Sequence, residues 1–108
     1  MNIKEIKPKR YFNCGKSVKL AHVADIILEE DELITFKSKE NKEYDFVCKE
    51  WGYYATPSIN KRLKKNGYKA ALMKNQNDEF FVVIVEIEKI KLWEKYNKEE
   101  EQLFVNWI

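Results

Sequence analysis

Apolar and polar side chains alternate through the first half of the chain, a pattern that predicts β-strands. Residues 18–28 alternate along their whole length, until an acidic turn at residues 29–32 ends the run. Residues 33–37 resume the pattern with β-branched and aromatic side chains, so we expect them to form an antiparallel pair with residues 18–28. A polar turn then leads into a third predicted strand at residues 43–49.

The segment that follows carries the signals of a short capped helix. Thr56 is suited to cap its free N–H groups, Pro57 to fill its first position, and Gly67 to close it in the left-handed conformation. Residues 68–74 and 79–87 then flank a polar loop and predict a hairpin. We expect the second strand of this hairpin to be the most buried, because both of its faces are apolar.

In the last fifth of the chain the period changes to that of a helix. Ile90, Trp93 and Tyr96 recur at spacings of three and would face the sheet. Asn97 is a capping residue at which the helix restarts or bends, because the apolar side chains of residues 103–107 continue at helical spacing.

These elements predict one α+β domain that covers residues 1–108, in the order β-β-β-α-β-β-α. We expect a largely antiparallel sheet of about five strands, with a short basic helix and a C-terminal amphipathic helix. Residues 1–17 are interpreted as an extended N-terminal arm whose aromatic pair, Tyr11 and Phe12, docks on the domain.

The composition limits the chemistry available to the chain. One His, two Cys and three Gly are too few for a histidine-rich metal cage or a glycine-rich phosphate loop, so we expect no metal and no cofactor. Cys14 and Cys48 lack a CxxC spacing and are interpreted as reduced thiols. Residues 80–85, the longest apolar run, fall far short of the ~20 residues of a membrane span, and the charged N-terminus is unlike a signal peptide. We therefore expect a cytoplasmic protein.

The distribution of charge is more informative than the total of +2. Residues 56–75 carry six basic and no acidic side chains, whereas residues 20–45 carry three basic and eight acidic ones. The basic side chains of the predicted helix form either a solvated face or a docking patch for an anionic partner; they are Lys61, Arg62, Lys64 and Lys65. The acidic remainder of the chain would repel a long polyanion, which favours a local anionic or acidic partner over nucleic acid.

Three large aromatic residues precede the predicted helix. Trp51, Tyr53 and Tyr54 form an aromatic wall beside the hydroxyl groups of Thr56 and Ser58 and the free N–H groups of the helix start. Such a wall suits a sugar, a base or an anionic group, because rings stack on flat faces while the N–H and hydroxyl groups donate hydrogen bonds. The alternative is that these rings pack in the core at the end of the sheet.

The same stretch resembles a group of small bacterial proteins that are associated with surface-polysaccharide and sugar-biosynthesis loci. The resemblance rests on residues 24–26 before the acidic turn and on residues 51–58, followed by Asn60, residues 62–64 and Gly67. The group has no assigned activity, so the resemblance implies only a bacterial cytoplasmic accessory protein and transfers no site residue.

Three hypotheses follow. The first is a non-catalytic module that binds a partner protein or a small anionic ligand through the aromatic and basic residues named above. The second is a nucleic-acid-binding protein that uses the basic helix together with Lys4, Lys7, Lys9 and Arg10. The third is an enzyme acting on a sugar derivative with His22 as base, beside Cys14 or Asp25, although Asp25 falls on the opposite face of a regular strand. The oligomeric state stays open: Trp107 and Ile108 form a dimer contact or close the core.

Overall fold

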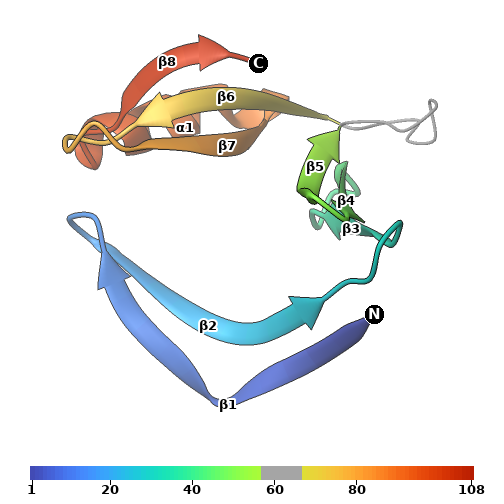
Figure 1. Cartoon of the computed structure of the whole chain (residues 1–108). Coiled ribbons are helices and arrows are strands. Elements are labelled where there is room, and N and C mark those ends of the chain that lie inside the picture. Colours follow the sequence, from blue (N-terminus) through green and yellow to red (C-terminus); the bar gives the residue numbers. More distant parts are fainter. Residues whose placement is uncertain (57–66) are drawn as a thin grey trace.

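The computed structural model describes residues 1–56 and 67–108. These residues form eight strands in three small antiparallel sheets, with one helical stretch (Figure 1). Sheet A pairs β1 (Asn2–Cys14) with β2 (Val18–Ile27). Sheet B has the order β3-β4-β5, and sheet C the order β7-β6-β8. The prediction of a single sheet of about five strands is therefore wrong.

Sheet A is a bowed hairpin whose middle lies away from the rest of the molecule, while its tip approaches sheet C and its base approaches sheet B (Figure 1). The segment interpreted as an extended arm forms β1 and pairs with β2, whereas β3 pairs with β4 in sheet B. The expected pairing of residues 18–28 with residues 33–37 is consequently wrong. Tyr11 and Phe12 are 58% and 46% exposed.

Sheet B consists of β3 (Leu33–Lys37), β4 (Glu43–Lys49) and β5 (Gly52–Thr56). The strands at residues 33–37 and 43–49 are as predicted, and β4 holds most of the buried residues of the sheet. The predicted order of elements contains no strand at the position of β5. Aromatic side chains also favour strands, and Tyr53 and Tyr54 pair with Cys48 and Val47 of β4.

Sheet C consists of β6 (Tyr68–Lys74), β7 (Phe80–Glu86) and β8 (Leu103–Trp107). The predicted hairpin is confirmed as β6 and β7. The expectation that its second strand is the most buried is wrong, since β7 is an edge strand and Phe80 and Val82 are 63% and 58% exposed. The buried position belongs to β6, in which Ala71 and Met73 are 0% exposed.

The predicted C-terminal helix is confirmed in its first half. A 3-10 turn, η1 (Ile87–Lys89), leads into α1 (Ile90–Glu99), which packs on sheet C through contacts of Trp93 with Phe104 and Trp107. The continuation of the helix beyond Asn97 is wrong. Glu101 turns the chain with a φ of 56°, and residues 103–107 become β8, paired antiparallel with β6.

The predicted basic helix, residues 56–67, falls almost entirely outside the described residues. Its two flanking positions are described. Thr56 is the last residue of β5, and Gly67 has a φ of 67°, the left-handed conformation predicted for it.

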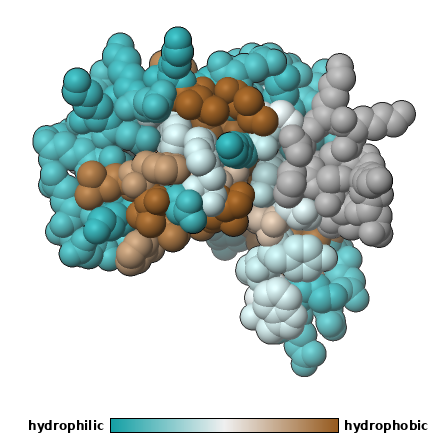
Figure 2. All heavy atoms as spheres, turned by 90° about the horizontal axis from the view of Figure 1, so that it is seen from above, coloured by the Kyte–Doolittle hydropathy of each residue, from teal (hydrophilic) through white to brown (hydrophobic). Residues whose placement is uncertain are grey.

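The buried apolar residues of the described chain are few. They lie on β4, β6 and β7, where Tyr44 of sheet B also meets Tyr68 of sheet C edge to face. Large apolar side chains lie open elsewhere, and the view from above shows several of them between hydrophilic residues (Figure 2). The fold thus positions many apolar side chains at the surface, where they are free to contact a partner.

Candidate functional site

The aromatic stretch singled out in the sequence lies at the surface, on and just before the edge strand β5. Trp51 is 72% exposed, Tyr53 61% and Tyr54 40%. These exposures rule out the alternative in which the three rings pack in the core. Within residues 1–56 and 67–108, no strand pairs with the outer edge of β5, which makes that edge a place where a partner can contact the sheet.

The three rings do not form one wall. Trp51 and Tyr54 stack with ring centroids 6.3 Å apart and planes 21° from parallel. Tyr53, the neighbour of Tyr54 on the strand, points to the opposite face of sheet B. There it lines an apolar groove of about 260 Å³ together with Phe46 of the sheet and Leu28 of the hairpin base. The exposed platform is therefore the Trp51–Tyr54 stack, with Tyr53 on a separate apolar groove.

The charged and polar groups around the stack are held in place. Lys49 forms an ion pair with Asp31, and this hydrogen bond raises the pKa of Lys49. The phenol of Tyr54 is close enough to add to that shift. On the same face of sheet B, Thr56 pairs in register with Asp45, a fully buried carboxylate that accepts a hydrogen bond of 2.6 Å from Thr35. The stack therefore sits on an ordered base.

The rest of the predicted surface lies outside the described residues. It comprises Ser58, Lys61, Arg62, Lys64 and Lys65. The chain runs from the end of β5 directly into this segment, so the aromatic stack and the basic residues are close in sequence.

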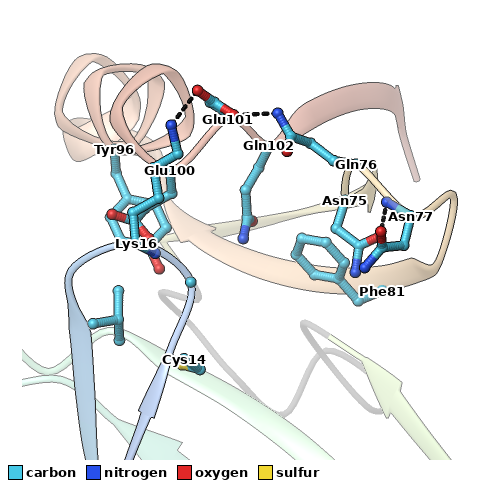
Figure 3. A pocket seen from close by; sticks show the side chains of 12 residues that line it. Cys14, Lys16, Asn75, Gln76, Asn77, Phe81, Tyr96, Glu100, Glu101 and Gln102 are labelled. Atoms are coloured by element: carbon cyan, nitrogen blue, oxygen red, sulfur yellow. Dashed lines mark hydrogen bonds and ion pairs between the residues drawn. The ribbon is translucent and has the colours of Figure 1, made fainter.

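A second concave region lies between the tip of the hairpin and sheet C. It was not predicted from the sequence. This junction pocket has a volume of about 510 Å³, and Figure 3 shows the side chains that line it. Cys14 and Lys16 come from the hairpin tip, Asn75 to Asn77 from the β6–β7 turn, and Tyr96 and Glu100 from α1 and its end. The sequence does contain three consecutive amide side chains at residues 75–77, but their composition predicts only a polar loop and not a pocket.

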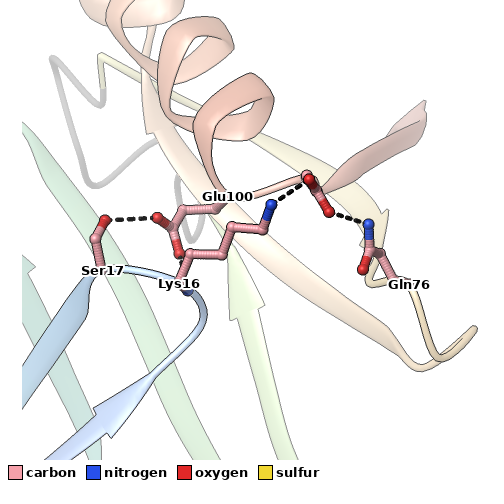
Figure 4. Close-up of polar contacts among 5 residues, drawn as sticks. Lys16, Ser17, Gln76 and Glu100 are labelled. Atoms are coloured by element: carbon pink, nitrogen blue, oxygen red, sulfur yellow. Dashed lines mark hydrogen bonds and ion pairs between the residues drawn. The ribbon is translucent and has the colours of Figure 1, made fainter.

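Two carboxylates at the end of α1 bind the hairpin tip (Figure 4). Glu100 accepts hydrogen bonds from the backbone N–H of Lys16 at 2.7 Å and from the Ser17 hydroxyl at 2.8 Å. Glu101 forms an ion pair with the Lys16 ammonium and accepts a hydrogen bond from Gln76. These hydrogen bonds lower the pKa of both carboxyl groups, so both stay ionised near neutral pH.

Several polar groups of the junction pocket are thus engaged within the protein. Asn75 is another example, because its side chain accepts hydrogen bonds from the N–H groups of Asn77 and Glu79. Tyr96 lies beside Glu100 and Cys14, and its pKa is raised mainly by burial. The pocket is therefore best described as a clamp that fixes the hairpin to α1 and the β6–β7 turn.

His22 and Asp25 do meet, contrary to the prediction that they face opposite ways. His22 Nε2 lies 2.8 Å from Asp25 Oδ1. The register between β1 and β2 is interrupted between Glu5 and Arg10, which stand opposite Ala24 and His22, so the pairing of β2 is irregular next to His22. Cys14 is not part of this pair. It is opposite Val18, about 13 Å along the strand from His22 at the usual rise per residue.

No family model, no curated protein and no solved structure matched this chain in the three comparisons. In residues 1–56 and 67–108, no group of three or more His, Cys, Asp or Glu side chains is placed to hold a metal ion. Within those same ranges, no helix combines the length and the apolar character needed to cross a membrane.

Proposed function

We propose that this chain is a non-catalytic accessory module that binds an acidic partner protein through the exposed Trp51–Tyr54 stack and the basic segment that follows it. The observation that carries the proposal is the exposure of Trp51, 72%, on a ring that already stacks on a second aromatic ring. Exposing a large aromatic surface to water is unfavourable, and such residues are enriched among those that dominate the energy of protein interfaces.

The shape of the site favours a protein over a small molecule. Small-molecule sites are concave and bury most of the ligand, whereas a side chain as exposed as Trp51 stands out from the surface. A partner with a flat or grooved surface can receive such a ring. The neighbouring edge of β5 offers backbone hydrogen bonds to the same partner.

The charge of the region supports an acidic partner. Residues 56–75 carry six basic side chains and no acidic ones, next to the aromatic stack in sequence. Lys49, a cation beside Tyr54, is already paired with Asp31, so we attribute the attraction for an acidic partner to the basic residues after Thr56. The resemblance to proteins of bacterial sugar-biosynthesis loci agrees with an accessory role in the cytoplasm.

The test compares binding by the wild-type chain, the Trp51→Ala/Tyr54→Ala variant and a matched control, Tyr11→Ala. Tyr11 is also an exposed aromatic residue on a strand, at 58%, but lies on the hairpin. Proteins retained by the immobilised wild-type chain would be identified, purified and titrated by isothermal calorimetry. Removing two central aromatic residues is expected to weaken binding by about 30-fold or more, and Tyr11→Ala to leave it unchanged.

Two further measurements separate the alternatives. Charge reversal at Arg62 and Lys65 should weaken binding to the acidic partner and make that binding less dependent on salt. Binding of the wild-type chain to the acidic partner should in turn depend less steeply on salt than binding to a nucleic acid does. Titration with single-stranded DNA and with sugar phosphates tests the nucleic-acid and small-anion hypotheses directly. The proposal would be contradicted if the Trp51→Ala/Tyr54→Ala variant bound every identified partner as tightly as the wild type. Binding only to DNA or only to sugar phosphates would also contradict it.

A further inference from the structure

The strand β7 lies at an edge of sheet C, and its side chains are mostly apolar. Sheet C has the order β7-β6-β8, so within the described residues no strand pairs with the outer edge of β7. The strand reads Phe-Phe-Val-Val-Ile-Val-Glu, without a proline, a lysine or a bulge. Those are the devices by which edge strands avoid pairing with another chain, and their absence marks β7 as a pairing edge.

The register of sheet C shows which residues present their backbone groups at this edge. Ile87 donates to Gly67, and Asn75 donates to Glu79, so hydrogen-bonded pairs fall on the odd-numbered residues of β7. Phe80, Val82, Ile84 and Glu86 therefore direct their N–H and C=O groups away from β6. These four residues form a regular ladder of donors and acceptors that faces outward.

We infer that a second copy of this chain pairs with the free edge of β7, β7 against β7 in antiparallel orientation, to form a symmetric dimer with one continuous six-stranded sheet. The ladder is complementary to itself. When the two-fold axis passes beside Val83, Val82 of each copy pairs with Ile84 of the other, and Phe80 with Glu86. This register is the one that pairs all four outward residues, and it keeps the two Glu86 carboxylates at opposite ends of the ladder.

An apolar groove beside the β7 edge also favours a second copy of the chain as the partner. It has a volume of about 440 Å³ and lies between β7 and α1, where Leu92 is 65% exposed. Val83 and Trp107 both pair with Ala71, so the three side chains lie on the same face of sheet C. Trp93 of α1 contacts Trp107, so α1 covers that face. In the symmetric sheet the two copies of α1 lie on the same face beside the two-fold axis. Leu92 of each copy then approaches the groove of the other.

The exposed area of the chain is consistent with such an interface. The chain exposes 8542 Å², against roughly 6,300 Å² for a compact monomer of the same mass. The excess of roughly 2,200 Å² exceeds the roughly 800 Å² that each partner buries in a standard interface. This inference does not rest on the proposed binding function, which uses β5, an edge strand of sheet B.

The first experiment measures molar mass over a concentration series by sedimentation equilibrium. The wild-type chain is expected to sediment at twice its mass of 13.0 kDa. Val82→Pro removes an outward N–H group without touching the pairs with β6, so the dissociation constant of the dimer should rise about tenfold or more, since symmetry removes the bond twice. The matched control is Lys37→Pro. The bonds of Ser38 to Lys42 and of Cys48 to Glu32 place Lys37 at the equivalent outward position of β3.

The second experiment tests the register. Residues directly opposite in a non-hydrogen-bonded pair have Cα atoms about 4.5 Å apart, close enough for a disulfide. In a Cys14→Ser background, Val83→Cys should cross-link across the two-fold axis on mild oxidation, and Val82→Cys should cross-link much less. A monomer at every concentration would overturn the inference. So would a dimer unaffected by Val82→Pro, or cross-linking that does not depend on the position of the cysteine.

Discussion

The β1–β2 hairpin and sheet C are both antiparallel and both rich in apolar side chains, yet those side chains end up in different places. No residue of β1 or β2 is buried, whereas Ala71 and Met73 of β6 are completely covered. The difference is a second layer. Sheet C has α1 packed on one face, whereas in the described part of the chain no helix packs on the hairpin. A two-stranded ribbon in water is marginally stable, so the hairpin depends on attachments at its ends.

Those attachments are polar. Glu100 and Glu101 hold the tip of the hairpin, and the Met1 ammonium forms an ion pair of 2.9 Å with Glu32 at its base. The stability of sheet C should therefore respond to apolar volume, and that of the hairpin to hydrogen bonds and charge. The following experiments test this contrast.

The largest effect is expected from Met73→Ala in sheet C. The side chain is 0% exposed, so its removal leaves a cavity and should reduce the free energy of unfolding by about 2–5 kcal/mol. The measurement is urea denaturation followed by circular dichroism. Phe12→Ala on the hairpin, where the ring is 46% exposed, serves as the control and should change that free energy by less than about 1 kcal/mol. Equal losses in the two variants would refute the contrast.

An intermediate effect is expected from Gly15→Ala at the hairpin tip. Gly15 has a φ of 63°, and a Cβ atom there would collide with the Glu100 carboxylate. The strain costs about 1–3 kcal/mol and should loosen the clamp, so amide exchange in β1 and β2 should accelerate while exchange in β6 is unchanged. Gly52→Ala also strains a left-handed φ, of 141°, but meets no atom. Its effect should leave the hairpin amides as they are.

The smallest effect is a pH dependence at the clamp. The hydrogen bonds from Lys16 and Ser17 lower the pKa of Glu100 below its ordinary value of 4.5. A carboxyl group with a depressed folded pKa contributes stability that is complete above the unfolded value and is lost as the pH falls through the folded value. The difference in unfolding free energy between wild type and Glu100→Gln should therefore be constant above about pH 5.5 and shrink below pH 4.5.

A second variant at the clamp identifies the cause of that dependence. Ser17→Ala removes one of the two hydrogen bonds but keeps the carboxylate, so its acid profile should lie between those of the wild type and Glu100→Gln. A profile of Glu100→Gln parallel to that of the wild type at every pH would show that the clamp does not depend on the charge of Glu100.

Sequence patterns within a single segment were enough to predict several of the strands and the helix. The alternation at residues 33–37 and 43–49, the polar loop of the β6–β7 hairpin and the helical period from Ile90 were all sufficient to place β3, β4, β6, β7 and α1. The pairing of strands was not predictable in the same way. Whether residues 18–28 pair with residues 2–14 or with residues 33–37 depends on which partner is longer and closer, and both have strand-forming sequences.

The candidate site shows the same limit. The sequence identified Trp51, Tyr53 and Tyr54 as distinctive, but their positions on the surface follow from β5 being an edge strand, which only the complete pairing reveals. The sequence pattern did not indicate that Glu100 binds the hairpin, because its partners Lys16 and Ser17 lie more than 80 positions away in the chain. Contacts between such distant residues leave no local periodicity to read.

The separation in sequence between the hairpin tip and Glu100 determines the order in which the parts of the clamp are synthesised. Lys16 leaves the ribosome 84 residues before Glu100, a delay of roughly 4–17 s at ordinary rates of translation. A hairpin forms in microseconds, so β1 and β2 can pair long before the groups that hold their turn exist. For those seconds the ribbon carries Ile3, Phe12 and Leu20 in the open. The nascent chain is therefore most vulnerable to aggregation, and most accessible to a chaperone, in its first 28 residues.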